Sequence, residues 1–276
     1  MSAAALPTLF LSHGSPMWAL EPGTSGPALT RWAAELRERL AGQGQALRGV
    51  VLMSPHWMTR QPAVMTHAQP ATWHDFGGFP EPLYRLQYPA PGEPGLAQQV
   101  LSLLQAASVP AVADPQRPLD HGAWVPLMHL FPQADVPVVQ VALPAGAGPR
   151  EVYAMGQALA GLREAGVLVI GSGSMTHNLG EFFGGRPEQN DPAAAYANEF
   201  SRWVEDAVTR GDREALLDYR RLAPHAVRAH PTEEHFLPIF FALGAAGWGA
   251  DAGVAPEYLT REIMYRYLAM DAFALA

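Results

Sequence analysis

Short apolar runs alternate along the chain with longer segments in which apolar residues recur every three or four positions. Runs without polar positions are typical of strands buried on both faces, and strands that alternate with helices favour a parallel sheet. The pattern therefore predicts an α/β fold, with a single domain over residues 1–276 and a mostly parallel central sheet flanked by helices. The expected strands are 7–11, 49–54, 62–66, 109–113, 136–142 and 167–171.

Helical periodicity is clearest after residue 191. Asp191 is expected to cap a helix over 192–209, Pro192 suits its first turn, and Gly211 follows its end. The aromatic residues of this segment share one apolar stripe, which indicates core packing. The other expected helices are 27–41, 94–107, 122–131, 149–165 and 232–246, and the tail 257–273 is expected to add one or two strands.

Two long segments rich in glycine and proline, 68–93 and 172–190, fit neither pattern. Loops of this length in a compact domain are usually functional. In the first, a Gly-Gly pair followed by several prolines is consistent with a lid of fixed shape over a site. His74, Phe79 and Tyr84 are then expected to contact a substrate, and the alternative is that these rings pack onto the core.

Three of the predicted strands are followed by a histidine among turn-forming residues. His13, His56 and His177 each come after an apolar run. In open α/β sheets ligands bind beyond the carboxyl ends of the strands, so these three side chains are expected at one edge of the sheet. Histidine is the commonest metal ligand, and three at the same topological position favour a metal site there over three separate structural roles.

A fourth candidate ligand, His235, lies in the segment HPTEEHFLPIFFALG. Thr232 can cap a helix in this segment, and the glutamates after it suit a first turn. A protonated histidine in that turn would oppose the helix dipole, so a neutral imidazole on a metal is the better interpretation of His235. His230, which precedes a proline, is expected to face solvent.

His121 lies directly before the predicted helix 122–131 in the motif LDHGAW, and it follows Asp120. A histidine at such a junction beside a carboxylate can act as a general acid or base. It can equally be a loop histidine tied to the backbone. The residues alone leave both interpretations open.

Composition narrows the available chemistry. All 18 basic residues are arginine and there is no cysteine, which excludes lysine Schiff bases, a P-loop lysine, thiolate nucleophiles and Cys-bound metals. The GSGSM segment lacks the spacing of a nucleophile elbow or a dinucleotide loop, so Gly171 and Gly173 are interpreted as letting the backbone pass close to a bound group. A net charge of −8 and the lack of a long apolar run predict no nucleic-acid partner, no membrane partner and a cytoplasmic location.

Six short motifs, in one order along the chain, together resemble the DODA-type branch of the class III extradiol ring-opening dioxygenases. The resemblance covers nearly the whole chain. It implies a metal-dependent α/β enzyme that opens the ring of a DOPA-like or other small catechol with O2, with its metal at the C-terminal ends of the strands. The motifs are HGSPM, SPHW, HDFGGFP, LDHGAW, GSGSMTHN and PTEEHFLP.

The resemblance also implies roles for single residues. His13, His56 and His235 match the ligands of one divalent metal per chain, His177 matches a fourth ligand or an acid/base, and His121 matches a second catalytic histidine beside the substrate. Fe(II) is expected for catalysis, although three imidazoles suit Zn(II) as well. The chain itself carries no prediction of oligomeric state.

Two alternatives to the dioxygenase remain open at this point. A zinc-dependent hydrolase would use the same histidines, with Glu234 as its base. A non-catalytic, Memo-like binding protein would use the same fold without its chemistry.

Overall fold

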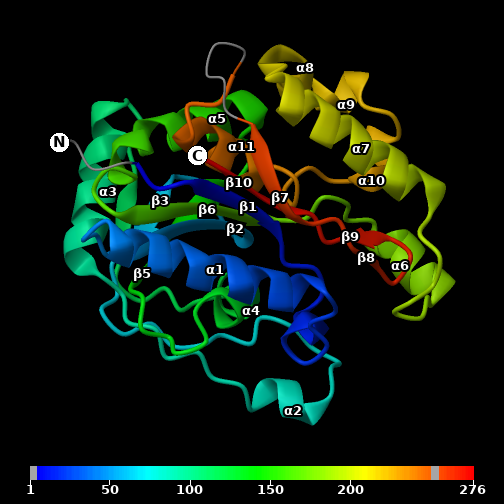
Figure 1. Cartoon of the computed structure of the whole chain (residues 1–276), viewed down its shortest axis with the longest axis horizontal. Helices are drawn as coiled ribbons and strands as arrows, with labels where there is room; N and C mark the ends of the chain where they lie inside the picture. The colour runs from blue at the N-terminus through cyan, green and yellow to red at the C-terminus, as the bar shows by residue number, and fades with distance from the viewer. Residues whose placement is uncertain (1–4, 250–254) are drawn as a thin grey trace.

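Eight strands form the central sheet in the computed structural model, which describes residues 5–249 and 255–276. Their order is β4-β3-β5-β2-β6-β1-β10-β7 (Figure 1). The four middle strands β5, β2, β6 and β1 run parallel, and β10 pairs antiparallel with β1 and with β7. The sheet strands are β1 (Thr8–Ser12), β2 (Gly49–Thr59), β3 (Ala63–Met65), β4 (Val112–Asp114), β5 (Val138–Pro144), β6 (Val167–Gly173), β7 (Pro256–Thr260) and β10 (Ala272–Leu275).

Helices cover both faces of this sheet, as Figure 1 shows. One core contains α1 and α4, and the other contains α3, α5, α7 and α11. Neighbouring residues of one strand enter different cores: Val50 packs in the first and Val51 in the second. The bounds are α1 (Ser25–Gly42), α3 (Pro94–Ala106), α4 (His121–Leu130), α5 (Pro149–Ala158), α7 (Ala195–Arg210) and α11 (Pro238–Ala245).

Shorter elements lie around these layers. A hairpin of β8 (Ile263–Met264) and β9 (Leu268–Ala269) forms a separate two-stranded sheet. The remaining helices are α2 (Glu81–Tyr84), α6 (Leu179–Gly185), α8 (Arg213–Leu217), α9 (Tyr219–Leu222) and α10 (Ala226–Ala229), with 3-10 turns η1 (Pro16–Ala19) and η2 (Ala160–Leu162).

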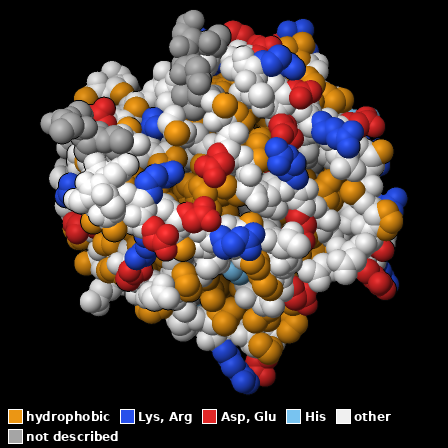
Figure 2. Space-filling model, in the orientation of Figure 1, with side chains coloured by type: hydrophobic (Ala, Val, Ile, Leu, Met, Phe, Trp, Pro, Cys, Tyr) orange, Lys and Arg blue, Asp and Glu red, His pale blue; other side chains and the backbone are white. Residues whose placement is uncertain are grey.

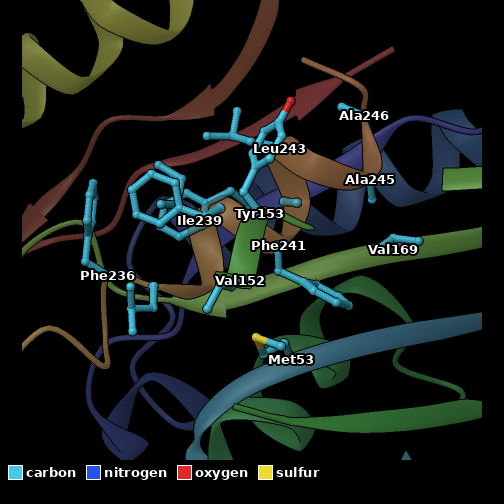
Figure 3. Packing of buried hydrophobic residues seen from close by; sticks show 14 of the residues in the cluster. Met53, Val152, Tyr153, Val169, Phe236, Ile239, Phe241, Leu243, Ala245 and Ala246 are labelled. Carbon is cyan, nitrogen blue, oxygen red and sulfur yellow. The ribbon is translucent and has the colours of Figure 1, made fainter. Parts of the chain in front are cut away.

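The helix α11 is buried on all sides between β6 and α5 (Figure 3). Two glycines let the helices α5 and α11 touch through their backbones. A Cβ at Gly156 would lie 2.1 Å from the carbonyl oxygen of Phe241, and one at Gly244 would lie 2.0 Å from that of Tyr153. This close packing fixes the position of α11, and the segment before α11 carries His235.

The predicted mostly parallel α/β fold is confirmed, and so are five of its helices in outline. The predicted helix 232–246 begins only at Pro238, because residues 231–237 form turns. The helix predicted from 192 begins at Ala195, and the Asp191 side chain accepts the backbone N–H of Glu188 instead of capping it. The tail forms four short strands where one or two were expected.

None of the helices in the described part of the chain is long and apolar enough to cross a membrane.

Candidate metal centre

The C-terminal ends of β1, β2 and β6 meet at one edge of the sheet, as the strand-then-histidine pattern predicts. His13 directly follows β1, and its backbone N–H donates to the carbonyl of Gly173 at the end of β6 (2.9 Å). His177 lies four residues beyond β6. The parallel direction of these strands therefore brings histidines from distant parts of the chain together.

His56 reaches this edge through an irregularity in β2. Ser54 pairs with Ala142 of β5, but the next paired residue on β2 is Met58, so residues 55–57 bulge out of the ladder. Such bulges re-aim side chains next to functional sites. The bulge is held by the hydroxyl of Ser54, which accepts the backbone N–H of His56 (3.2 Å).

His235 arrives from the segment before α11, and two glycines of β6 make room for it. A Cβ at Gly173 would lie 2.4 Å from the carbonyl oxygen of His235, and one at Gly171 would lie 1.9 Å from that of Pro238. The interpretation that these glycines admit a bound group is thus corrected. They admit the protein's own backbone, and with it a histidine of the site.

The Nε2 atoms of three histidines converge. His56 Nε2 lies 3.1 Å from His13 Nε2 and 3.3 Å from His235 Nε2. Three imidazoles bound to one ion at about 2.1 Å would place their nitrogens about 3.0 to 3.4 Å apart, in octahedral or tetrahedral geometry respectively. The observed separations fit that range.

Hydrogen bonds on the far side of the rings set the tautomers of His13 and His235. Ser172 donates its only hydroxyl proton to the carbonyl of Gly122, so its oxygen accepts the Nδ1–H of His13 (3.1 Å). Glu234 Oε1 accepts the Nδ1–H of His235 (3.1 Å). Both Nε2 lone pairs therefore face the point of convergence, where a shared cation would relieve their repulsion.

The three converging histidines, His13, His56 and His235, are uncharged at neutral pH. Burial is the main cause, reinforced by the neighbouring imidazoles, and it lowers the pKa of His56 to about 3 and the pKa values of His13 and His235 well below the usual range. Metal binding requires neutral imidazole, so the cluster is ready to bind without losing protons.

His121 borders the same cluster, and its carboxylate partner is Asp75. Asp75 Oδ1 accepts both the backbone N–H of His121 (2.9 Å) and its Nδ1–H (3.0 Å), while Oδ2 lies 3.7 Å from His56 Nδ1. The predicted neighbour Asp120 is instead fully buried with Arg117 and Gln140. Asp75 lies in the HDFGGFP motif, but no pattern in the sequence marked it as a residue of the site.

His177 stacks on His235, with ring centroids 3.5 Å apart and planes 7° from parallel. Burial lowers its pKa to about 4, against an opposing effect of Glu234. Ligand atoms of His177, Glu234 and His235 lie within 4.8 Å of one another, as do those of His13, His56 and His121. The five histidines thus form one continuous cluster.

A cavity of about 340 Å³ opens onto the cluster and is lined by His56, His121, His177 and His235. Phe79, which the sequence places in a possible substrate lid, lines the cavity together with Phe76. The structure does not bring His74 or Tyr84 to the cavity wall. The His74 Nε2 atom bonds to the carbonyl of Leu86 (3.0 Å), and both rings pack behind Phe76.

His230 was expected in solvent, and that expectation is wrong. It is fully buried, its Nε2–H donates to the carbonyl of Met175 (2.9 Å), and it packs on Phe200 and Phe236. Burial lowers its pKa to about 3.

The chain is similar to known proteins over most of its length. Residues 7–269 match the family described as the catalytic LigB subunit of aromatic ring-opening dioxygenase. The chain belongs to this family. Among curated relatives, the 4,5-DOPA dioxygenase extradiol of Beta vulgaris is 41% identical over 247 residues, which cover 89% of this chain and 88% of that protein. The 4,5-DOPA dioxygenase extradiol of Escherichia coli is 35% identical over 249 residues, covering 89% and 87%.

A solved structure agrees with the fold of this LigB-family chain. The crystal structure of an uncharacterized Escherichia coli K12 protein superposes with a TM-score of 0.76 at 28% identity, covering 98% of this chain and all of the other. The LigB-family chain is an extradiol dioxygenase that opens the ring of a catechol, and the histidine cluster fits the divalent metal of that family. The hydrolase and binding-protein alternatives are not supported.

Proposed function

We propose that His13, His56 and His235 bind one divalent metal, Fe(II) in the active enzyme. The observation that carries this assignment is the convergence of their Nε2 atoms at separations of 3.1 and 3.3 Å. The neutral state of the three rings and the Nδ1 partners of His13 and His235 support it. Zn(II) would fit the same donors but is redox-inactive.

The reaction joins one catechol and one O2 into a single ring-opened product. The bond between one hydroxyl-bearing ring carbon and its neighbour outside the diol breaks. One atom of O2 ends in the carboxylate formed at the first carbon and the other in the carbonyl group formed at the second. The electrons come from the catechol, so no further reductant is needed. When bound, the metal supplies positions for the diol and for O2 and a path for electrons between them.

His121 and His177 handle the protons in this proposal. The Nδ1–H of His121 is held by Asp75, so its Nε2 lone pair is free to accept a proton from a catechol hydroxyl. The developing imidazolium would be stabilised by the Asp75 carboxylate beside it. His177 is neutral at working pH because of burial, and it is available as a second base or as a further ligand.

The walls of the cavity orient the ring. Phe76 and Phe79 lie on the side that carries His121, with ring centroids 5.6 Å apart for Phe76 and His121. His74 and Tyr84 contact Phe76 from behind and hold it in place. We assign them a supporting role in substrate binding. The relatives named 4,5-DOPA dioxygenase indicate the class of substrate, a small catechol.

The test measures bound metal and oxygen uptake after anaerobic loading with Fe(II). His13→Ala, His56→Ala and His235→Ala should lose the metal and all turnover. His121→Ala and His177→Ala should keep the metal and lose about 10²- to 10⁴-fold in turnover, the usual contribution of general acid–base catalysis.

Each outcome assigns a role. If His177→Ala empties the site as completely as His13→Ala, His177 is a ligand and not an acid/base. If His235→Ala keeps its metal while His121→Ala loses it, the third ligand is His121.

A further inference from the structure

The cavity beside the histidines is walled by apolar side chains. They come from four separated segments: η1, the loop before α2, α6 and the β8–β9 hairpin. In Figure 2 hydrophobic side chains also gather at the end of the molecule that carries α2, below a face where acidic and basic groups alternate. The apolar wall consists of Met17, Phe76, Phe79, Leu179, Phe182 and Leu268.

The polar side chains of the lining, other than the histidines, are bonded within the protein. The hydroxyl of Tyr265 donates to Glu21 Oε2 (2.6 Å). The hydroxyl of Ser15 accepts the backbone N–H of Met17 (3.3 Å) at the start of η1. Neither group has its hydrogen-bonding capacity fully free for a ligand.

No cation lines the cavity among residues 5–249 and 255–276, and all 18 arginines lie in those ranges. Arg117 comes near the site, but its Nη2 donates to the carbonyl of His56 (3.2 Å) and to Asp120, and its guanidinium lies between two tryptophan rings. Arg228, beside α6, forms an ion pair with Glu181. A carboxylate on a bound ligand would therefore find no arginine partner in this lining.

The exposed edge of the apolar wall marks the mouth of the cavity. Leu179 is 42% exposed and Phe183, also a lining residue, is 67% exposed. A catechol whose diol faces the histidines would direct a ring substituent away from them, toward the apolar part of the lining.

We infer that this site selects catechols with an uncharged, apolar ring substituent over catechols with a charged one. The inference rests on the proposed function and narrows its substrate class. A charged group transferred from water into an apolar wall without a partner loses its hydration, whereas an alkyl or aryl group gains by leaving water. The residues that we expect to contact the ring substituent, and so to set this selectivity, are Leu179, Phe182 and Phe79.

The first experiment compares four catechols of similar length: 4-ethylcatechol, dopamine, 3-(3,4-dihydroxyphenyl)propionate and L-DOPA. Oxygen uptake by the Fe(II)-loaded protein gives kcat/KM for each. Calorimetry with Zn(II)-loaded protein under anaerobic conditions gives binding without turnover. 4-Ethylcatechol should exceed the other three at least about tenfold by both measures, the lower end for a mismatch in a binding pocket.

A second experiment adds the missing cation. Leu179→Arg should raise kcat/KM and affinity for 3-(3,4-dihydroxyphenyl)propionate relative to those for 4-ethylcatechol by about twofold to fivefold, as expected of a partly exposed ion pair. Leu222→Arg is the matched control, because Leu222 is 43% exposed but lies on α9, outside the cavity lining. It should leave the ratio unchanged.

The outcomes separate this inference from the proposed function. Turnover of L-DOPA or dopamine equal to or above that of 4-ethylcatechol overturns the inference and leaves the dioxygenase standing. Preferential binding of 4-ethylcatechol without any oxygen uptake upholds the inference and overturns the assigned chemistry. If none of the four catechols binds, both are wrong.

Discussion

Asp75 contacts two histidines of the site at once. It accepts two hydrogen bonds from His121 and lies 3.7 Å from His56 Nδ1. Burial opposes its charge, but its hydrogen bonds with His121 outweigh burial and lower its pKa. The carboxylate therefore stays ionised and orients the ring of His121.

Asp75→Asn should lower kcat about 10- to 100-fold, the usual effect of removing a group that supports a metal ligand. The amide oxygen can still accept from His121, so the fold and the melting temperature should change little. Steady-state oxygen uptake and metal content measure the effect. Asp135→Asn, which removes an exposed carboxylate paired with Arg37, serves as control and should leave kcat unchanged. Normal turnover in the Asp75 variant would refute the orienting role.

His230 makes the stability of the protein depend on pH. Its pKa is about 3 in the folded protein, compared with about 6.5 in an unfolded chain. Between these values the unfolded chain binds a proton that the folded protein does not, so stability is full above pH 6.5 and falls as the pH is lowered. At pH 5 the loss from this residue is about 2 kcal/mol.

His230→Gln should flatten that dependence, because the amide can donate to the carbonyl of Met175 but does not titrate. Urea unfolding of metal-free protein at pH 7 and pH 5 measures it. The difference in unfolding free energy between the two pH values should shrink by about 2 kcal/mol in the variant. Parallel losses in the variant and the wild type would show that other groups dominate.

At the scale of single residues, the sequence indicated the histidines but not their partners. His13, His56 and His177 were found because each follows an apolar strand, a pattern that is local in the chain. Asp75 lies 46 residues from His121, and no local pattern links the two. His230 and His235 share one segment, yet tertiary packing buries the first away from the site.

Among the elements, β6 positions His235 through its glycines rather than through side chains. Gly173→Ala would place a methyl group 2.4 Å from the carbonyl oxygen of His235, so the segment before α11 must shift. Metal affinity should fall about tenfold or more, as it does when a contact that supports a metal ligand is lost. The free energy of unfolding should fall by about 1–3 kcal/mol because the added methyl group overpacks the contact.

Metal titration and thermal unfolding of Gly173→Ala test this role of β6. Gly42→Ala is the matched control, since a Cβ there meets nothing within 4 Å and the residue lies at the end of α1. Wild-type affinity in the Gly173 variant would mean that the segment adapts without cost.

The contact between β6 and the segment before α11 shows why the boundaries of elements were harder to predict than their existence. The apolar runs of β1, β2 and β6 were predicted correctly because each strand is covered on both faces. The helix at 232–246 was predicted six residues too long at its start, because its apolar and acidic positions also suit the turns over 231–237 that bring His235 to the metal site. The close backbone contact with Gly171 and Gly173 favours the turns, and sequence periodicity does not report such contacts.

Across the whole molecule, metal binding should stabilise the fold, because the proposed ligands follow β1, lie in β2 and precede α11. An ion present at about 100 times its Kd adds about 2.7 kcal/mol, which corresponds to roughly 5–10 °C in Tm for a chain of this size. Calorimetric scans with and without a chelator measure the shift. His235→Ala should lose most of it, whereas His225→Ala, at the surface, should keep it. Equal shifts in both variants would place the ion elsewhere.

The wide spacing of the converging histidines also determines the order of events in folding. His56 lies 43 residues from His13 and 179 residues from His235. Closing loops of that length costs more entropy than in a zinc finger, whose ligands are close in sequence, so an ion would recover less of its binding free energy before the sheet is paired. The apo-protein must therefore fold first, and the rate of metal uptake is then set by access to a finished cavity rather than by chain collapse.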